Sequence, residues 1–227
     1  MNIGTRHGRD AEIANARALA ELRTTTITSI ATRGDRLALS RHRVFGRDQR
    51  PEAFHMEVLG ILEINADSQL GARIVFDLDA IDAAVEELDA RYLAGEAAAY
   101  SHTWSAVIRA YASFNRRELP ATTPDWLNID HRRGAAFAPG DVIPYIRSAW
   151  DVAADISIYI VAVHRLSHLG AVVTYAANGT SGEGFDAEWR EITLLTFESD
   201  LISRCEIFDE VDLGAAIARF DELKSTL

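Results

Sequence analysis

The sequence has almost no lysine and almost no cysteine. Lys224 is the only lysine and Cys205 the only cysteine among 227 residues. A single cysteine excludes a disulfide within the chain, and a lone thiol is typical of a reducing compartment. One lysine near the C-terminus leaves almost no candidate for Schiff-base catalysis. The other basic residues are arginines, a bias of the kind found in high-GC, actinobacterial sequences.

Long apolar runs and an excess of positive charge are also missing. The longest apolar run, residues 156–163, is far shorter than the ~20 residues that cross a bilayer. The sequence shows no signal peptide, so we expect a cytoplasmic protein without a membrane partner. The net charge of −11 argues against binding to nucleic acid. The locally basic run 33–50 alternates with apolar residues, as the solvated face of a strand does.

Motifs for nucleotide and metal cofactors are absent as well. The sequence contains no GxGxxG, no P-loop and no serine nucleophile elbow. His164 and His168 have a spacing that binds metal on a helix, but here they flank the end of a predicted strand and a turn, without a nearby carboxylate. We therefore expect neither a cofactor nor a metal site.

What the sequence does have is one pattern written twice. "VFDLDAIDAAVEELDAR" at 75–91 and "IFDEVDLGAAIARFDEL" at 207–223 each join the end of a strand to an amphipathic helix. Each follows a helix, at 10–22 and 141–151, and four strands. The two sets of strands are 24–33, 35–46, 54–64 and one ending at Phe76, and 155–166, 170–180, 188–197 and one ending at Phe208. Glu57 aligns with Glu191 in this repeat.

Two glycine-containing segments predict tight turns between strands. Residues 33–36 include Arg33-Gly34-Asp35, and residues 178–180 are Asn-Gly-Thr. Glycine supplies the positive φ that such turns need, and this explains both segments better than integrin binding or glycosylation. Meandering strands with grouped helices indicate the α+β class.

The two copies are not equally complete. Before its short helix the second copy has a long helix at about 96–118 and a short strand at 126–132. The long helix has an apolar stripe at spacings of three and four: Trp104, Val107, Ile108, Tyr111 and Phe114. The first copy has neither element, and its first residues correspond to 132–141. We therefore predict an incomplete first copy at 1–95 and a complete second copy at 96–227.

This order of elements, with "NIDHRRG" at 128–134 and the strand ends "VFD" and "IFDE", resembles the nuclear transport factor 2-like superfamily. Within it, the chain is most similar to actinobacterial SnoaL-like domains. The resemblance implies a cystatin-type α+β roll, in which a cone-shaped, curved antiparallel sheet and its helices enclose an apolar pocket. It also implies that the two copies pack on each other as a pseudo-dimer, and it leaves room for a homodimer.

The resemblance also suggests chemistry. Ketosteroid isomerases of this superfamily use a carboxylate base and a second, protonated acid, which fall here on Asp130 and Glu191. Two carboxyl groups in one apolar cavity would repel each other and resist ionisation, which suits proton transfer at a carbon acid. The isomerases' helix tyrosine, however, would fall on Ala110. The Asp-Arg-Asp arrangement of the superfamily's epoxide hydrolases cannot be placed on the sequence.

Each candidate residue also has a structural interpretation. Asp130 can cap a turn or pair with Arg132 or Arg133. Glu191 matches Glu57 of the less complete copy, which favours a buried pair with an arginine. The candidate ligand-binding residues can line a pocket or simply fill a core. They are Trp104, Ile108, Tyr111, His131, Tyr145, Trp150, Trp189 and Phe208.

Three functions follow from these alternatives. The first is a tandem module that binds a small apolar molecule in its second copy, in a regulatory or interaction role. The second is an isomerase, cyclase or epoxide-hydrolase-type enzyme, with Asp130 as base and Glu191 as acid, acting on a polyketide- or steroid-like substrate. The third is an oligomerisation scaffold with filled pockets.

Overall fold

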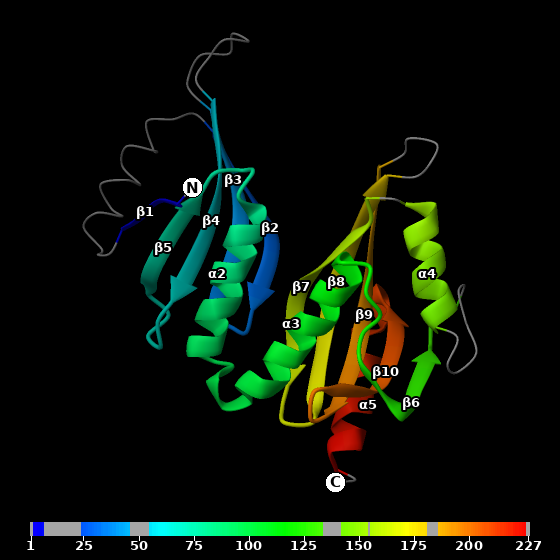
Figure 1. Ribbon diagram of the computed structural model, residues 1–227. Coiled ribbons are helices and arrows are strands. Elements are labelled where there is room, and N and C mark those ends of the chain that lie inside the picture. Colours follow the sequence, from blue (N-terminus) through cyan, green and yellow to red (C-terminus); the bar gives the residue numbers. More distant parts are fainter. Residues whose placement is uncertain are drawn as a thin grey trace. The chain divides into compact units, whose positions relative to one another are not determined.

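The computed structural model describes residues 2–6, 24–45, 55–133, 142–153, 155–180 and 186–225. The chain divides into two compact units, Met1–Glu96 and Ala97–Leu227. In the described residues each unit has one five-stranded sheet, with helix α2 packed on the first sheet and several helices packed on the second (Figure 1), so the predicted α+β class is confirmed. The helix predicted at 10–22 lies outside the described residues.

The first unit is built on a sheet in which every pair of neighbours is antiparallel. Its strands are β1 (Asn2–Arg6), β2 (Thr24–Arg33), β3 (Leu37–Phe45), β4 (His55–Ile64) and β5 (Leu70–Phe76), in the order β1-β5-β4-β3-β2. Leu39, Ile61 and Ile74 lie in register and form one buried row across three strands. Helix α2 (Ile81–Ala94) contacts β3 and β4 and buries Leu88.

The predicted turn at 33–36 joins β2 to β3. Gly34 has a φ of +56°, and a β-carbon there would overlap the carboxylate of Glu96. Arg33 is fully buried, and its Nε donates to Asp89 of α2 at 2.6 Å. The Arg-Gly-Asp tripeptide is therefore a structural turn whose arginine is held inside the unit.

The second unit repeats this sheet with one difference. Its strands are β6 (Thr122–Asp130), β7 (Ser157–Leu166), β8 (Gly170–Thr180), β9 (Asp186–Glu198) and β10 (Leu201–Asp209), in the order β6-β10-β9-β8-β7. All pairs are antiparallel except β6 with β10, which is parallel. The helical segments are η1 (Ala98–Tyr100), α3 (Ser101–Asn115), α4 (Val142–Val152), η2 (Glu210–Asp212) and α5 (Leu213–Ser225).

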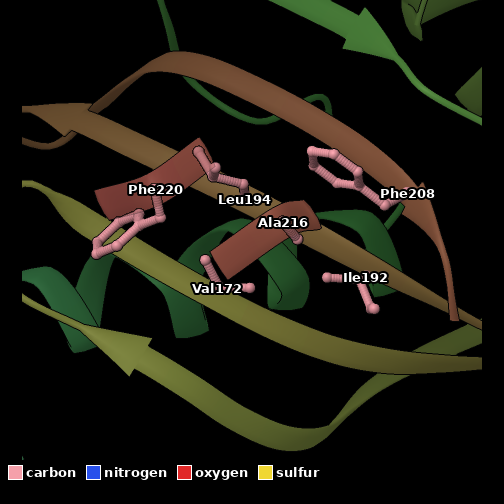
Figure 2. Packing of buried hydrophobic residues seen from close by; sticks show 6 residues of the cluster. All are labelled: Val172, Ile192, Leu194, Phe208, Ala216 and Phe220. Atoms are coloured by element: carbon pink, nitrogen blue, oxygen red, sulfur yellow. The ribbon is translucent and has the colours of Figure 1, made fainter. Parts of the chain in front are cut away.

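Alternation along the strands gives this second sheet two different faces. On one face, the side chains of Ala216 and Phe220 from α5 pack against four strand residues in a fully apolar cluster (Figure 2). The strand residues are Val172, Ile192, Leu194 and Phe208. The alternate residues of β8 and β9 point to the opposite face, which Tyr111 of α3 covers. A helix on each face buries both sides of β8 and β9.

Two predictions about the elements are wrong. The first copy does have a short strand at the edge of its sheet, because Asn2–Arg6 form β1 at the position that β6 occupies in the second unit. β1 pairs antiparallel, whereas β6 pairs parallel. In addition, Asn178-Gly179-Thr180 is not a turn but the last part of β8, paired with β9 up to Thr180. Gly179 serves there for close packing, since its added β-carbon would lie 3.1 Å from that of Ala153.

The alignment of Glu57 with Glu191 is also wrong. In the first sheet Phe76 pairs with Leu59, and in the second Phe208 pairs with Ile192. Leu59 thus matches Ile192, and Glu191 matches Val58. Because neighbouring residues of a strand point to opposite faces, Glu57 and Glu191 lie on opposite faces of their sheets. Glu57 forms ion pairs with two partly exposed arginines, Arg41 at 3.3 Å and Arg43 at 3.0 Å.

Candidate functional site

The second unit contains a cavity of about 130 Å³ on the sheet face covered by α3. Helices α3 and α4 and strands β7 to β10 all contribute to its wall. Most of the wall is aliphatic or aromatic, and the aromatic side chains are Tyr111, Phe114, Tyr145, Tyr175 and Trp189. Thr193 and Cys205 add a hydroxyl and a thiol. An engineered apolar cavity of ~150 Å³ binds benzene, so this cavity has room for about one ring.

Two tyrosine hydroxyls are held neutral at this cavity. Tyr111, three residues before Phe114 on the same helix face, meets the ring of Tyr175 edge to face at 5.7 Å. Burial raises the pKa of Tyr111, although a hydrogen bond with Thr193 acts in the opposite direction. Burial, and then the neighbouring Glu191 carboxylate, raise the pKa of Tyr175. Both phenols therefore keep their protons at neutral pH.

The two predicted catalytic acids lie together, with an arginine between them. Arg132 Nε donates to Asp130 Oδ1 and Arg132 Nη2 to Asp130 Oδ2, each at 2.9 Å. Its third nitrogen, Nη1, donates to Glu191. The side chain of Asp130 is fully buried and that of Glu191 is 11% exposed. Asp130, Arg132 and Glu191 thus form a buried acid–arginine–acid network.

This network borders the cavity through two tyrosines. Tyr175 donates its hydroxyl to Glu191, and Arg132 Nη1 donates to the hydroxyl of Tyr145 at 3.3 Å. The guanidinium carbon also lies 5.2 Å from the centre of the Tyr145 ring. Burial disfavours the charge on Arg132, but the hydrogen bonds with Asp130 and Tyr145 outweigh it and raise the pKa of Arg132. The charged network is thus hydrogen-bonded to two of the phenols that line the cavity, Tyr145 and Tyr175.

This geometry changes the predicted chemistry. The sequence predicts two carboxyl groups that repel each other in an apolar cavity, whereas Arg132 lies between them. Glu191 accepts hydrogen bonds from Arg132 and Tyr175. Asp130, Arg132 and Glu191 form an acid–arginine–acid network, in which the second acid is a glutamate and not the aspartate of an Asp-Arg-Asp arrangement.

Cys205 is a cavity residue that sequence reasoning missed. It lies on β10 opposite Leu195 of β9, and both line the cavity. Burial, followed by the charges of Glu206 and Asp130, raises the pKa of Cys205 to about 12. The thiol is therefore neutral and a weak nucleophile at physiological pH. Its alternation with Ile207 on a predicted strand is the signal that could have found it.

The predicted ligand-binding residues divide into three groups. Tyr111, Tyr145 and Trp189 line the cavity. Three others stand near it but are not among the described residues of its wall. They are Trp104, which is fully buried on α3, Ile108 of the same helix, and Trp150 of α4, which lies 5.4 Å from Phe114 between ring centres.

The remaining two, His131 and Phe208, belong to the opposite face of the sheet. Their rings stack at 4.2 Å, and Phe208 is part of the apolar cluster under α5 (Figure 2). His131 Nε2 lies 2.8 Å from the buried carboxylate of Glu206. Because His131 directly follows Asp130, strand alternation turns it away from the cavity.

Glu206 is the centre of a structural cluster on that face. Arg204 donates to it at 2.8 Å and Arg219 of α5 at 3.2 Å, in addition to its contact with His131. Burial opposes ionisation, but the hydrogen bonds from these side chains outweigh it and hold the pKa of Glu206 below its ordinary value. The cluster ties α5 to β10.

Neither a metal centre nor a membrane-spanning helix is found in the described part of the chain. The described residues contain no group of three or more His, Cys, Asp or Glu side chains that could hold a metal ion. His164 lies 2.7 Å from the hydroxyl of Thr174. Among the helices described above, none is long and apolar enough to cross a membrane.

The sequence matches no family model and no curated protein. Solved structures that align with it include an NTF2-like protein of unknown function from Burkholderia pseudomallei (20% identity, 52% of this chain and 96% of that one, TM-score 0.40). Another is a SnoaL-like protein from Jannaschia sp. CCS1 (13%, 49% and 87%, 0.40). A third is a protein with a ketosteroid isomerase-like fold from Catenulispora acidiphila in complex with trimethylamine (15%, 45% and 83%, 0.38).

These are the same kinds of protein that the sequence resembles. At such identities and scores the likeness concerns the fold alone, and a fold of this kind carries many unrelated functions. The function of this chain must therefore be argued from its own cavity.

Proposed function

We propose that the second unit binds a small, mainly apolar molecule of about one ring in its cavity. The observation that carries this proposal is the cavity itself, about 130 Å³ in volume and lined almost entirely by aliphatic and aromatic side chains. Ligand sites are typically concave, largely apolar and supplied with a few polar groups that orient the ligand. Here the hydroxyls of Tyr145, Tyr175 and Thr193 supply those groups.

The open cavity and the paired carboxylates favour a binding module over a scaffold or an enzyme. A scaffold with filled pockets would leave no such space in its core, since interiors are packed to the density of organic crystals. An enzyme needs a group free to move a proton, whereas both carboxylates are held by Arg132. The tandem, regulatory role of the chain and the packing of its two copies on each other stay predictions.

Ligand-induced stabilisation tests this proposal directly, with toluene as the probe. All four tryptophans, Trp104, Trp126, Trp150 and Trp189, lie in the second unit, so their fluorescence follows the unfolding of that unit alone. A ligand present at 100 times its Kd stabilises the native state by ~2.7 kcal/mol. We expect toluene to raise the melting temperature followed by tryptophan fluorescence.

A matched pair of variants on α4 locates the binding. Ala149 lines the cavity, and the exposed Ser148 beside it does not. We expect Ala149→Phe to fill the cavity and abolish the stabilisation by toluene, and Ser148→Phe to leave it intact. Stabilisation that survives Ala149→Phe means that toluene binds elsewhere. If toluene does not bind the wild type at all, the proposal fails.

A second function, an enzyme acting on a polyketide- or steroid-like carbonyl or epoxide, rests on the acid–arginine–acid network beside the cavity. In it Asp130 or Glu191 would accept a proton once a substrate draws Arg132 away. We expect such turnover to disappear in Asp130→Asn while the stabilisation by toluene persists. Turnover that is unchanged in Asp130→Asn would remove this carboxylate from the mechanism.

A further inference from the structure

The sheet register places Glu191 on the cavity face, between two residues of the cavity wall. Trp189 and Thr193, which lie on either side of it along β9 at a spacing of two, both line the cavity. Tyr175 of β8, which pairs with Glu191 across the sheet, lines it as well. Because residues at this spacing share a face of a strand, the Glu191 carboxylate lies beside the aromatic wall of the cavity.

The charged network at this border has an excess of negative charge. Asp130 and Glu191 contribute two carboxylates, and Arg132 contributes one guanidinium. None of the described residues that line the cavity carries a charge, so the wall itself does not offset this excess. Coulombic attraction acts across a layer of side chains and is stronger inside a protein than in water. A positive charge in the cavity is therefore favoured even without contact with the carboxylates.

The Cys205 thiol responds to the same excess on another part of the wall. Burial, then the charges of Glu206 and Asp130, raise its pKa. Arg132 acts in the opposite direction, but its effect is smaller than that of either carboxylate. The electric field on this side of the cavity therefore also opposes negative charge and favours positive charge.

The wall of the cavity can also bind a cation by direct contact. Its aromatic side chains are Tyr111, Phe114, Tyr145, Tyr175 and Trp189. The face of an aromatic ring attracts a cation, and several rings together bind alkylated ammonium groups. The guanidinium of Arg132 already lies over the Tyr145 ring, 5.2 Å from its centre. Tyr175 donates its hydroxyl to Glu191, which polarises the phenol and makes its ring richer in electrons.

The polar atoms of the wall determine which kind of cation fits. An ammonium group with N–H bonds needs acceptors around it, because buried donors without partners are costly. The carboxylates of Asp130 and Glu191 accept from Arg132 and are not among the described residues of the wall. A positive nitrogen without N–H, alkylated or part of an aromatic ring, needs no acceptor. The volume of about 130 Å³ limits the ligand to about one ring.

We infer that the cavity binds a small organic cation of about one ring, whose positive nitrogen carries no N–H. The aromatic wall contacts the ligand, and the excess negative charge of the Asp130–Arg132–Glu191 network attracts it. This inference rests on the proposed function, because it names the charge of the ligand that the same cavity binds.

N-methylpyridinium and toluene are matched probes, because they have the same shape and differ in charge. We expect titration calorimetry on the wild-type protein at pH 7 to show that N-methylpyridinium binds at least tenfold more tightly than toluene, an effect of about 1.4 kcal/mol. Benzoate, an anion with the same ring, should bind more weakly than toluene. If N-methylpyridinium binds no more tightly than toluene or benzoate, the inference is overturned, and binding of toluene then leaves the proposed function standing. Binding of none of the three would overturn the proposed function itself.

The two variants on α4 distinguish the cavity from the acidic surface of the protein. We expect Ala149→Phe, which fills the cavity, to abolish binding of N-methylpyridinium, and Ser148→Phe to preserve it. Binding that survives Ala149→Phe would assign the cation to the surface, where the net charge of −11 attracts cations without a built site. That result would overturn the inference.

Glu191→Gln tests whether the network causes the preference for positive charge. The amide keeps an acceptor for Tyr175 and Arg132 but removes one negative charge. We expect the affinity for N-methylpyridinium to fall by roughly fivefold or more, and the affinity for toluene to change by less than about twofold. An equal change for both probes would mean that Glu191 affects only the shape of the cavity, which contradicts the inference.

Glu188→Gln is the matched control for this substitution. Glu188 lies on the same strand, is 49% exposed and pairs with Arg190 at 3.1 Å. Because solvent screens its charge, we expect the affinity for N-methylpyridinium to stay unchanged. If Glu191→Gln does not fold, the comparison of N-methylpyridinium with toluene in the wild type and in Ala149→Phe decides alone.

Discussion

Arg132→Met removes the cation that lies between two buried carboxylates, and it tests the network most directly. The side chain of Asp130 is fully buried and that of Glu191 is 11% exposed, so neither can turn to water in place. Taking away one partner of a buried ion pair costs about 3–5 kcal/mol, because it leaves an uncompensated charge inside the protein. Here two carboxylates lose the same partner, so we expect the upper part of that range at pH 7.

Urea unfolding followed by tryptophan fluorescence measures this loss in the second unit alone. With a slope of about 2 kcal/mol per molar urea, the midpoint should fall by roughly 2–2.5 M.

Arg190→Met is the control for a surface pair. Arg190 and Glu188 are 38% and 49% exposed and lie 3.1 Å apart, so their pair is screened by solvent. We expect a change within about 0.5 kcal/mol. A cost below about 1 kcal/mol for Arg132→Met at pH 7 would refute the description of the network as a buried cation between two carboxylates.

Three further predictions use other contacts. The pKa of Glu206 is lowered by folding, so its charge contributes stability above pH ~4.5 that is lost as the pH falls through the folded-state value. Urea unfolding should show that Glu206→Gln is destabilising at pH 7 and that its cost decreases as the pH falls below ~4.5. Gly170→Ala places a β-carbon on the carbonyl oxygen of Leu195, so its urea midpoint should drop sharply, whereas Gly214→Ala meets no atom within 4 Å and should leave the midpoint equal or higher. The half-buried Cys205 thiol, with its pKa of about 12, should react with Ellman's reagent at pH 8 at least ~100-fold more slowly in the native protein than in 6 M urea, and fast native labelling would contradict the raised pKa.

Much of the fold could be predicted from the sequence, because hydrophobic alternation and turn residues are local signals. The strands predicted at 24–33 and 170–180 have those bounds in the structure, and the helix predicted at 141–151 occupies Val142–Val152. Pairing is not a local signal. The residues of β1 and β6 do not indicate that β1 pairs antiparallel and β6 parallel, because the direction of pairing depends on the distant strand that each one meets.

The site was predictable only where a residue type and its strand position sufficed. Asp130 and Glu191 do lie together, but the sequence suggests Arg132 only as a partner of Asp130. The partnership with Glu191 joins residues 59 positions apart, which a single sequence does not reveal. His131 is among the predicted pocket residues, but it directly follows Asp130, and adjacent strand residues point to opposite faces.

The parallel pairing of the edge strand β6 affects when the cavity of the second unit can form during folding. β6 supplies Asp130 to the network that borders the cavity, and within the described sheet it pairs with β10 alone. His131, one residue after β6, contacts Glu206 across 75 positions. Contacts of such long range form late in folding, because the loop must close before they contribute. We therefore expect the ligand pocket to be completed in one of the last steps of folding of the second unit. During synthesis, the cavity should form only after β10, which supplies Ile202, Cys205 and Ile207 to its wall, has left the ribosome.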